Sequence, residues 1–331
     1  MEMIGRCLLI VGFFLSSMNG IASAEENFSG DDRVSKEEMI YLLVDKQKLK
    51  ADLMTWGNTK DKSEKLMSYR IAIGKAEGDK QREGDNKTPE GIYITQEIID
   101  GRGLPAKYGP FAIPIDFPNP PDLAAKKTGY GIWLHGVEKD KRIEAAKVTE
   151  GCVAFYNSDI VMLKSWLRPF QGVVVIADTT EGVNRESDVA SVLEHTKEWY
   201  AAWQNRNIAN YLDAYHQDFR YKRMNRRLFS KYKERVFSKY KEMNVDISNI
   251  RVFSHEKYAM AIMNQNFNGD NRYVTQGRKI LYWNRTEDGG WKIRHEVFER
   301  RRLKFSNYSQ MEFARLRLDS PSSKSLKTKS L

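Results

Sequence analysis

The charge of this chain changes sign near residue 190, which predicts two domains of different character. Residues 25–189 carry 24 Lys and Arg against 28 Asp and Glu, a net charge of −4. Residues 190–305 carry 24 against 13, a net of +11, and residues 306–331 carry 5 against 2, a net of +3. Domains usually contain about 100–200 residues, so a chain of 331 residues has room for two.

Residues 1–24 are predicted to be a signal peptide. Arg6 precedes an apolar run from Leu8 to Leu15, and Ala22-Ser23-Ala24 supplies the small residues that a signal peptidase reads. The run is shorter than the roughly 20 apolar residues that span a bilayer, and no later segment approaches that length. We therefore expect an exported protein without an integral membrane span. An uncleaved membrane tether is the alternative.

One cysteine, Cys152, remains after removal of the signal peptide, because Cys7 leaves with it. A lone thiol in an exported protein cannot close an intramolecular disulfide, which directs attention to its reactivity. A thiol with a pKa of about 8.5 needs a nearby base or cation to act as a nucleophile, and His135, 17 residues earlier, could supply one. The alternative is a small buried apolar cysteine and a core histidine.

Glycines adjoin both of these residues. Gly136 lets the chain turn after His135, and a carbonyl in this turn could fix the imidazole tautomer. Gly151 has no Cβ, so that a substrate carbonyl can approach the backbone there. The N–H groups of Gly151 and Cys152 are candidate donors to an oxyanion.

The pattern of residues 25–180 predicts a mainly β domain. Strands are expected at residues 39–44, 49–56, 65–74, 91–98, 129–134 and 172–177, with an exposed loop over 74–91. Residues 105–122 hold six prolines and are predicted to be irregular. Asn157, Ser158 or Asp159 should cap a helix that follows Cys152. Its apolar face would carry Ile160, Leu163 and Leu167.

Residues 181–190 are predicted to be a linker, residues 191–305 an α+β domain, and residues 306–331 a basic disordered tail. Helical spacing covers residues 189–219, and a basic helix follows in which the motif Phe-Ser-Lys-Tyr-Lys-Glu occurs at 229–234 and 237–242. Strands are expected at residues 246–254, 258–267, 273–286 and 291–300, the last two joined by a turn at 287–290. The predicted fold class is α+β in both domains, with strands prevailing in the first.

Other sites receive less support from the sequence. His195, His216 and His255 show no ligand spacing, so no metal site is expected. His295 is predicted to share a core-facing strand face with Trp291, Ile293 and Val297, or to form the floor of a pocket. The glycine-rich stretch before Tyr93 lacks the ending of a phosphate-binding loop, and no cofactor is expected. The basic domain suits an anionic polymer such as cell wall better than nucleic acid in an exported protein, and a solvated basic face is the alternative.

Four motifs in order closely resemble the L,D-transpeptidase catalytic domain, the YkuD family. They are GKAEGDKQREGDNKTPEGIY from Gly74, YGPFAIPIDFPNPPD from Tyr108, GIWLHG from Gly131 and EGCVAF from Glu150. The resemblance covers about residues 38–178 and implies action on peptidoglycan stem peptides, at the bond between the L-centre of the third residue and a following D-alanine.

The resemblance also implies roles for individual residues. Cys152 would be the acyl-accepting nucleophile, His135 the base, and Gly136 the residue whose carbonyl orients the histidine, with Gly151 beside them. Many family members have Arg two places after the cysteine, where this chain has Ala154, so the binding of a substrate carboxylate by that Arg is not carried over. Candidate substrate-binding residues are Tyr130, Trp133 and Thr149.

The whole chain is similar to cell-shape-determining L,D-carboxypeptidases, which have a C-terminal NTF2-like domain. The segment WYAAWQNRNIANYLDAYHQDF from Trp199 fits that domain. The resemblance implies trimming of tetrapeptides to tripeptides, with water as the acceptor. Transfer to an amine, as in an L,D-transpeptidase, and a non-catalytic wall-binding adaptor acting through the basic domain are the alternatives. Some relatives carry an N-terminal dimerisation segment, for which little room exists here, so the sequence leaves the oligomeric state open.

Overall fold

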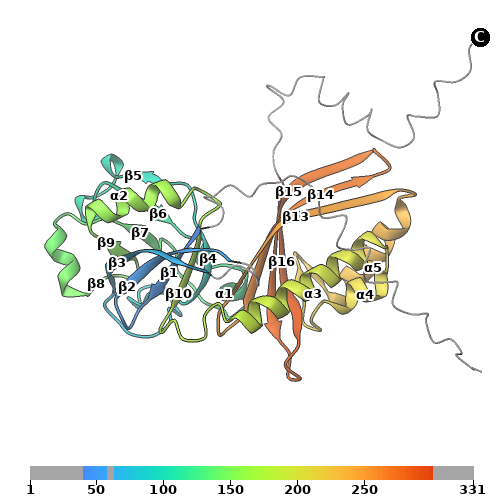
Figure 1. Ribbon diagram of the computed structural model, residues 1–331, viewed down its shortest axis with the longest axis horizontal. Coiled ribbons are helices and arrows are strands. Elements are labelled where there is room, and N and C mark those ends of the chain that lie inside the picture. Colours follow the sequence, from blue (N-terminus) through green and yellow to red (C-terminus); the bar gives the residue numbers. More distant parts are fainter. Residues whose placement is uncertain (1–39, 58–62, 301–331) are drawn as a thin grey trace, which may run out of the picture. The chain divides into compact units, whose positions relative to one another are not determined.

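The computed structural model describes residues 40–57 and 63–300 (Figure 1). The predicted signal peptide and the predicted tail lie outside these residues. The α+β class predicted from the sequence is confirmed, with strands prevailing in the first domain and helices preceding a sheet in the second. None of the helices in the described part of the chain combines the length and apolar character that crossing a membrane requires.

A mixed sheet organises the first domain, in the order β4-β10-β1-β2-β3-β9-β7-β6-β5, with β8 paired to β3. Its strands are β1 (Ile40–Asp45), β2 (Lys50–Thr55), β3 (Lys65–Gly74), β4 (Gly91–Ile94), β5 (Ile99–Asp100), β6 (Phe111–Pro114), β7 (Trp133–His135), β8 (Lys147–Thr149), β9 (Val153–Phe155) and β10 (Val173–Ala177). The short helical elements are η2 (Gly101–Gly103), η3 (Ala106–Tyr108), α1 (Pro120–Ala124) and η4 (Asp140–Ala145).

Strand β10 is buried on both faces, which explains its continuous apolar sequence. Val174 and Ile176 belong to the core of the first domain, whereas Val173 and Val175 belong to a second apolar cluster on the opposite face. β10 runs parallel to β1 and antiparallel to β4, so neighbours cover both of its edges. A strand enclosed in this way has no reason to alternate apolar and polar residues.

Helix α2 (Asn157–Trp166) lies over the sheet of the first domain (Figure 1). Ile160, Leu163 and Leu167 are fully buried, as the predicted apolar face requires. The predicted side-chain cap is wrong: Tyr156 is the N-cap residue and makes no capping hydrogen bond. Asn157 instead bonds to both the N–H and the C=O of Val137, so its side chain holds the turn that follows β7.

Two segments predicted to be irregular or exposed are more ordered than their composition indicated. Within residues 105–122 the chain forms β6 and the capping box of α1, in which the Asn119 side chain accepts from the Asp122 N–H. Within residues 74–91, Lys80 and Thr88 are buried. The many charged residues of this loop bind partners within the protein, which sequence composition alone does not reveal.

Three helices open the second domain: α3 (Glu186–Gln204), α4 (Ile208–Asp213) and α5 (Arg226–Lys239). α3 begins inside the segment predicted as linker. The helical spacing predicted over residues 189–219 is confirmed as far as Asp213, but two helices share it, because Arg206 adopts a left-handed conformation and Asn207 caps the new helix α4. α5 buries Phe229 and Phe237, the two repeated phenylalanines, on one face as predicted. A small ribbon of β11 (Arg220–Tyr221) and β12 (Met224–Asn225) precedes it.

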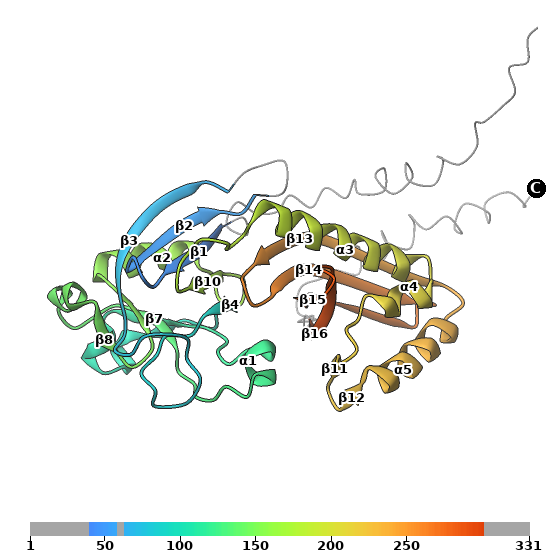
Figure 2. The ribbon, with the colours of Figure 1, turned by 90° about the horizontal axis from the view of Figure 1, so that it is seen from below.

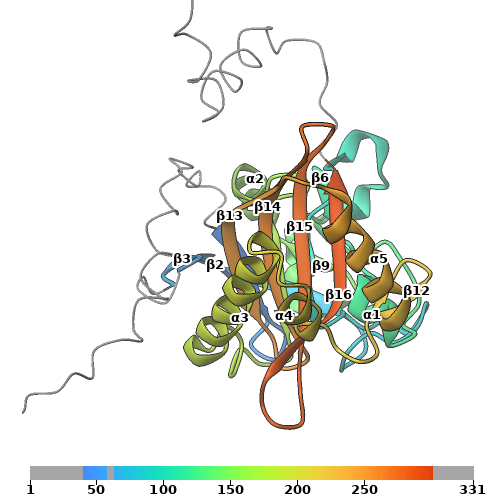
Figure 3. The same ribbon diagram turned by 90° about the vertical axis from the view of Figure 1, so that its right-hand side faces the viewer.

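Four antiparallel strands complete the second domain: β13 (Met243–Ser254), β14 (Ala259–Gly269), β15 (Tyr273–Arg285) and β16 (Trp291–Arg300). All four strand predictions are confirmed within a few residues. The three helices lie in front of this sheet in Figure 3, and α3 follows β13 in Figure 2. An aromatic-rich core fills the space between them and includes Trp199, Trp203 and Tyr211.

The predicted position of His295 is wrong. An irregularity in the β15–β16 pairing shifts the register between Tyr282 and Trp283, so that His295 pairs with Tyr282 while Ile293 pairs with Trp283. One extra residue in a strand reverses the face of every side chain that follows. Glu296 therefore shares the buried face of β16 with Trp291 and Ile293. His295 is only half-buried.

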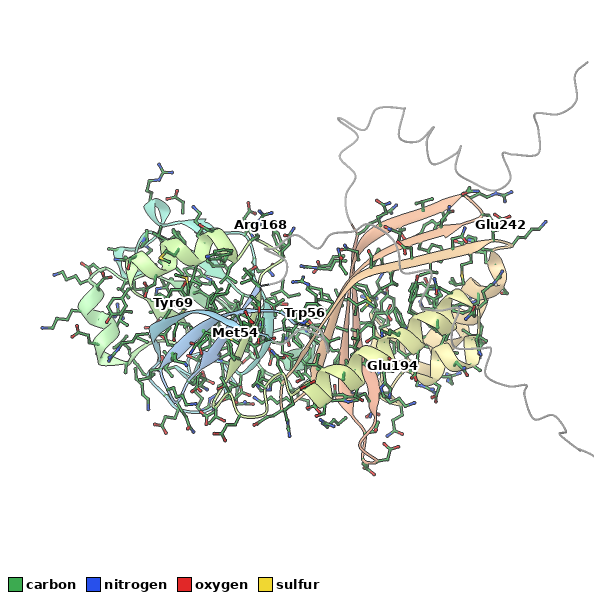
Figure 4. The ribbon with its side chains drawn as sticks, viewed as in Figure 1. Met54, Trp56, Tyr69, Arg168, Glu194 and Glu242 are labelled. Carbon is green, nitrogen blue, oxygen red and sulfur yellow. The ribbon has the colours of Figure 1, made fainter. Side chains whose placement is uncertain are left out.

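The two domains share an apolar cluster. Side chains of β4 and β10 meet Phe253, Met260 and Tyr282 from the four-stranded sheet. Trp56, labelled in Figure 4, donates its indole N–H to the carbonyl of Val252 at 3.0 Å. Strand β14 thus contributes to both the core of its own domain and this shared cluster.

Candidate functional site

His135 ends β7, and Cys152 directly precedes the neighbouring strand β9. β7 and β9 run parallel, with Leu134 paired to Val153 and His135 to Ala154. Extending that register by one residue places Cys152 beside Trp133. Because side chains alternate along a strand, Trp133 and His135 share one face. The sheet thereby brings together the nucleophile and base candidates that the sequence separates by 16 residues.

The turn after His135 fixes the orientation of its imidazole. Nδ1 lies 2.5 Å from the Gly136 carbonyl oxygen, so that Nδ1–H donates to this acceptor and Nε2 carries the lone pair. The peptide that follows is held by Asn157, whose Oδ1 accepts from the Val137 N–H and whose Nδ2 donates to the Val137 carbonyl, both at 2.9 Å. The contact between His135 and Gly136 is the one that the sequence predicted.

The pair is neutral in the absence of substrate. Burial lowers the pKa of His135 to about 4, and the positive charges of Arg142 and Lys107 act in the same direction. Burial raises the pKa of the Cys152 thiol to about 11, although the Trp133 backbone N–H and Lys107 oppose that shift. The thiol donates to the Gly131 carbonyl at 3.4 Å. Such a site needs base-assisted proton removal at the moment of attack rather than a preformed thiolate.

The turn that presents Cys152 is tied together by Thr149. Its hydroxyl donates to the Cys152 carbonyl at 2.7 Å and accepts from the Gly151 N–H at 3.2 Å. The residue is buried, and its hydroxyl is occupied within the turn rather than offered to a cleft. The Gly151 N–H is engaged as well, which leaves Cys152 N–H as the remaining candidate oxyanion donor of the predicted two.

Glycine is required at position 151 by both conformation and space. Its φ of +125° is a conformation that L side chains rarely adopt, and a Cβ there would lie 2.7 Å from the Lys87 carbonyl oxygen. Gly151 thus permits close contact between the turn that carries Cys152 and the loop over residues 74–91. This role is separate from the approach of a substrate carbonyl that the sequence predicted there.

Aromatic residues cover the histidine. The Tyr108 ring centroid lies 5.0 Å from that of His135 and 4.9 Å from that of Trp133, and Lys107 places its ammonium 5.1 Å from the Tyr108 centroid. Tyr130 is 79% exposed, so it is available to a ligand. Tyr108 and Lys107 have no role that the sequence predicts, because they precede His135 by more than 25 residues and only the fold brings them near.

An open groove of about 820 Å³ lies next to this site. It is lined by the 106–110 segment, by Val137 and by the exposed side of α2, including Asn157 and Met162. Cys152 and His135 do not line it. The groove is therefore adjacent to the backbone that holds the histidine and separate from the reacting atoms.

A buried charged cluster in the second domain escaped the sequence analysis. Glu296 binds Lys279 and the Tyr215 hydroxyl, each at 2.7 Å. Lys233 lies within 5.0 Å of the ring centroids of Trp203 and Tyr211. Only the register shift in β16 directs Glu296 inward, and this shift has no signal in the sequence. Among the described residues, no group of three His, Cys, Asp or Glu side chains is arranged to hold a metal ion.

The fold and the site define a sheet-rich domain that carries a buried Cys–His pair, joined to a domain in which helices cover a four-stranded antiparallel sheet. Residues 40–176 match the family model of the L,D-transpeptidase catalytic domain, YkuD, and residues 191–297 match that of the Cds6 C-terminal NTF2-like domain. The first domain is thus similar to the L,D-transpeptidase catalytic domain, and the second to the Cds6-type NTF2-like domain.

Solved structures share this two-domain arrangement. Bd1075 from Bdellovibrio bacteriovorus is 27% identical, with a TM-score of 0.67 over 80% of this chain and 94% of that one. A point mutant of the helical cell shape determining protein Pgp2 from Campylobacter jejuni is 25% identical, with a TM-score of 0.64 over 78% of this chain and 90% of that one. No curated protein matches the sequence.

Proposed function

We propose that this protein is an exported, periplasmic L,D-carboxypeptidase that trims peptidoglycan stem tetrapeptides to tripeptides and thereby influences cell shape. The observation that carries the proposal is the position of Cys152 and His135 at the ends of the paired strands β9 and β7, with Nδ1 of the histidine held by the Gly136 carbonyl. The match to an L,D-transpeptidase catalytic domain supports peptidoglycan as the substrate. The similarity to a helical cell shape determining protein supports the biological role.

The geometry suits a two-step acyl transfer. As Cys152 Sγ bonds to the carbonyl carbon before the terminal D-alanine, its proton passes to Nε2 of His135. The Cys152 N–H stabilises the oxyanion. The C–N bond then breaks, and the imidazolium gives its proton to the nitrogen of the departing D-alanine. Because burial holds the pKa of His135 near 4, this imidazolium is a strong general acid.

Hydrolysis of the thioester completes the cycle. Water attacks the acyl carbon while His135 takes a proton from it, the C–S bond breaks, and the same proton restores the Cys152 thiol. The products are a tripeptide carboxylate and D-alanine. Tyr130 and Trp133, beside the reacting pair, are proposed to contact the stem peptide, while Thr149 holds the nucleophile turn.

The family match also favours a second candidate, an L,D-transpeptidase in which an amine replaces water. Incubation of the purified protein with tetrapeptide muropeptides separates the two reactions. We expect tripeptide and free D-alanine from wild type and neither from Cys152→Ala. Crosslinked dimers would support transfer instead. If wild type and Cys152→Ala give the same products, the enzymatic proposal fails.

The basic second domain is proposed to hold the enzyme near the anionic wall, since residues 190–305 carry a net charge of +11. A pull-down with isolated wall tests this role, by comparing wild type with a variant in which exposed lysines and arginines of α5 are replaced by glutamine. Weaker binding at equal stability supports the role, and equal binding contradicts it. A wall-binding adaptor without catalysis predicts normal binding and no Cys152-dependent product.

A further inference from the structure

One lysine of the second domain reaches the loop that supports the nucleophile turn. Lys257 lies in the turn between β13 and β14, and its Nζ lies 2.7 Å from Oδ2 of Asp79 and 3.1 Å from Oε2 of Glu90. Both carboxylates belong to the first domain, in the loop over residues 74–91. Neighbouring contacts fix the turn itself, because Tyr258 exchanges hydrogen bonds with both the N–H and the C=O of Ile92.

Asp79 and Glu90 close the base of this loop. The Glu90 N–H donates to Asp79 Oδ1 at 2.9 Å, which joins the two ends. The buried Lys46 binds Glu90 and the Gly78 carbonyl, each at 2.7 Å. Lys127 binds Asp79 and Asp122 from the other side. Three cations and three carboxylates thus alternate across the base, and Lys257 is the one member that the second domain supplies.

The closed loop touches the surroundings of Cys152 in two places. The Lys87 carbonyl packs against Gly151, with only 2.7 Å to the position of an added Cβ. The Gln81 carbonyl accepts from the Thr128 N–H at 3.1 Å, and this bond holds the segment that leads to Gly131. The Gly131 carbonyl in turn accepts from the Cys152 thiol. A displacement of the loop therefore moves both the backbone behind the nucleophile and the carbonyl to which its thiol donates a hydrogen bond.

We propose that Lys257 is a positioning residue for Cys152, by which the second domain sets the geometry of the first domain's site. Lys257 touches neither substrate nor the reacting atoms. It draws Asp79 and Glu90 together, and the loop that they close places Gly151 and Gly131 around the thiol. The activity readout of this proposal rests on the proposed carboxypeptidase function, whereas its alkylation readout does not.

Lysine variants of the full chain test the proposal first. Lys257→Met removes the charge and retains the length of the side chain, and Lys257→Arg retains the charge. Lys292→Met is the matched control, because Lys292 also forms an ion pair in the second domain, with Asp213 at 2.8 Å, and its side chain is 33% exposed against 37% for Lys257. The measurements are kcat and KM on a tetrapeptide, the rate of Cys152 alkylation by iodoacetamide against pH, and Tm.

We expect Lys257→Met to lower kcat by about tenfold with little change in KM, since misplacement of a reacting group acts mainly on the chemical step. Its alkylation profile should also differ from that of wild type. Lys257→Arg should restore both readouts, and Lys292→Met should match wild type. Glu90→Gln weakens the same ion pair from the first domain and should reproduce the loss of kcat. It therefore tests the proposal even if the Lys257→Met protein folds poorly.

The proposal is overturned if Lys257→Met and Lys292→Met show the same kcat and the same alkylation profile. It is also overturned if Lys257→Met changes only Tm. A wild-type protein without carboxypeptidase activity would defeat the proposed function, and the comparison of alkylation profiles would then decide the role of Lys257 by itself.

Discussion

The imidazole Nδ1 of His135 lies 2.5 Å from the carbonyl oxygen of Gly136, its immediate neighbour in the chain. In many catalytic triads a carboxylate accepts this hydrogen bond, whereas here a backbone carbonyl does. The tautomer of His135 therefore depends on the conformation of the main chain. That path is packed tightly. A Cβ at position 136 would collide with Asn157 Oδ1 and would lie 2.7 Å from Pro110 Cδ.

Gly136→Ala should therefore reduce kcat by about 100-fold, because the added methyl group displaces the carbonyl that orients His135. The hydrolysis of a tetrapeptide measures the effect. Gly103→Ala is the control, since nothing lies within 4 Å of a Cβ at that position. Equal activity of the two variants would show that the carbonyl position does not matter.

Alkylation of Cys152 should accelerate with pH through pH 9 and approach a plateau only near pH 11. The reason is burial, which raises the pKa of the thiol to about 11, so that the reactive thiolate forms late. Mass spectrometry of iodoacetamide-treated protein gives the rate, and Cys152→Ala supplies the background. A plateau reached below pH 7 would instead indicate a thiolate–imidazolium pair and contradict the neutral resting state.

Thr149→Val should lower both activity and stability, whereas Thr149→Ser should retain both. The hydroxyl of Thr149 joins the Cys152 carbonyl to the Gly151 N–H, and valine leaves both groups without this partner. Loss of buried hydrogen-bonding partners costs about 1–3 kcal/mol in the free energy of unfolding. Urea denaturation and tetrapeptide hydrolysis measure the two effects. Equal behaviour of Val and Ser would remove the hydroxyl from the explanation.

Acid should destabilise the protein between about pH 6.5 and pH 4. Burial lowers the pKa of His255 to about 4, helped by the charge of Lys257, so the unfolded chain binds a proton in this range that the folded chain rejects. Stability from this group is complete above the unfolded pKa. It is lost as pH falls, at up to about 1.4 kcal/mol per pH unit.

His255→Gln tests that assignment. The neutral imidazole donates to the Ile176 carbonyl through Nε2 and accepts from the Lys257 N–H through Nδ1, and an amide can supply one donor and one acceptor without titrating. We expect the variant to show a shallower decline of the free energy of unfolding between pH 6.5 and pH 4. An unchanged slope would assign the acid sensitivity to other groups, such as His135.

The spacing of apolar residues predicted the strands and helices well, because an element that buries one face must carry apolar side chains on that face. The sequence predicts the apolar faces of α2 and α5 and the valine run of β10. Each of these is buried in the structure, as its pattern requires. The break between α3 and α4 was missed, because Arg206 in a left-handed conformation leaves no pattern. Asn157 shows the same limit: its type and position suggest a helix cap, but its side chain binds the backbone of Val137, in the turn after β7.

The sequence predicted the candidate catalytic residues of the site but not the residues that position them. Cys152, His135 and Gly136 stand out by type and motif. Lys257, in contrast, lies over 100 residues from Cys152 and is one of many surface lysines in the sequence. Its relation to Asp79 follows from the pairing of two domains, which no local pattern encodes.

The buried cluster of the second domain gives a last prediction. Burial would raise the pKa of Glu296, but Lys279 and Lys233 outweigh it and lower that pKa to about 2. Glu296→Met should cost about 3–5 kcal/mol in the free energy of unfolding, because it leaves buried cations without their counter-charge.

The double variant Glu296→Met with Lys279→Met should recover much of that loss, since it removes a buried cation together with the carboxylate and fills the space with apolar atoms. Lys233 remains in the double variant. Burial already lowers its pKa to about 8, so the protein can keep Lys233 buried without Glu296 if the lysine releases its proton. Urea denaturation of the three proteins at pH 7 and pH 9 measures this. The single variant should regain stability at pH 9, where Lys233 is neutral. Equal stability of single and double variants at both pH values would mean that the charge balance does not hold this core together.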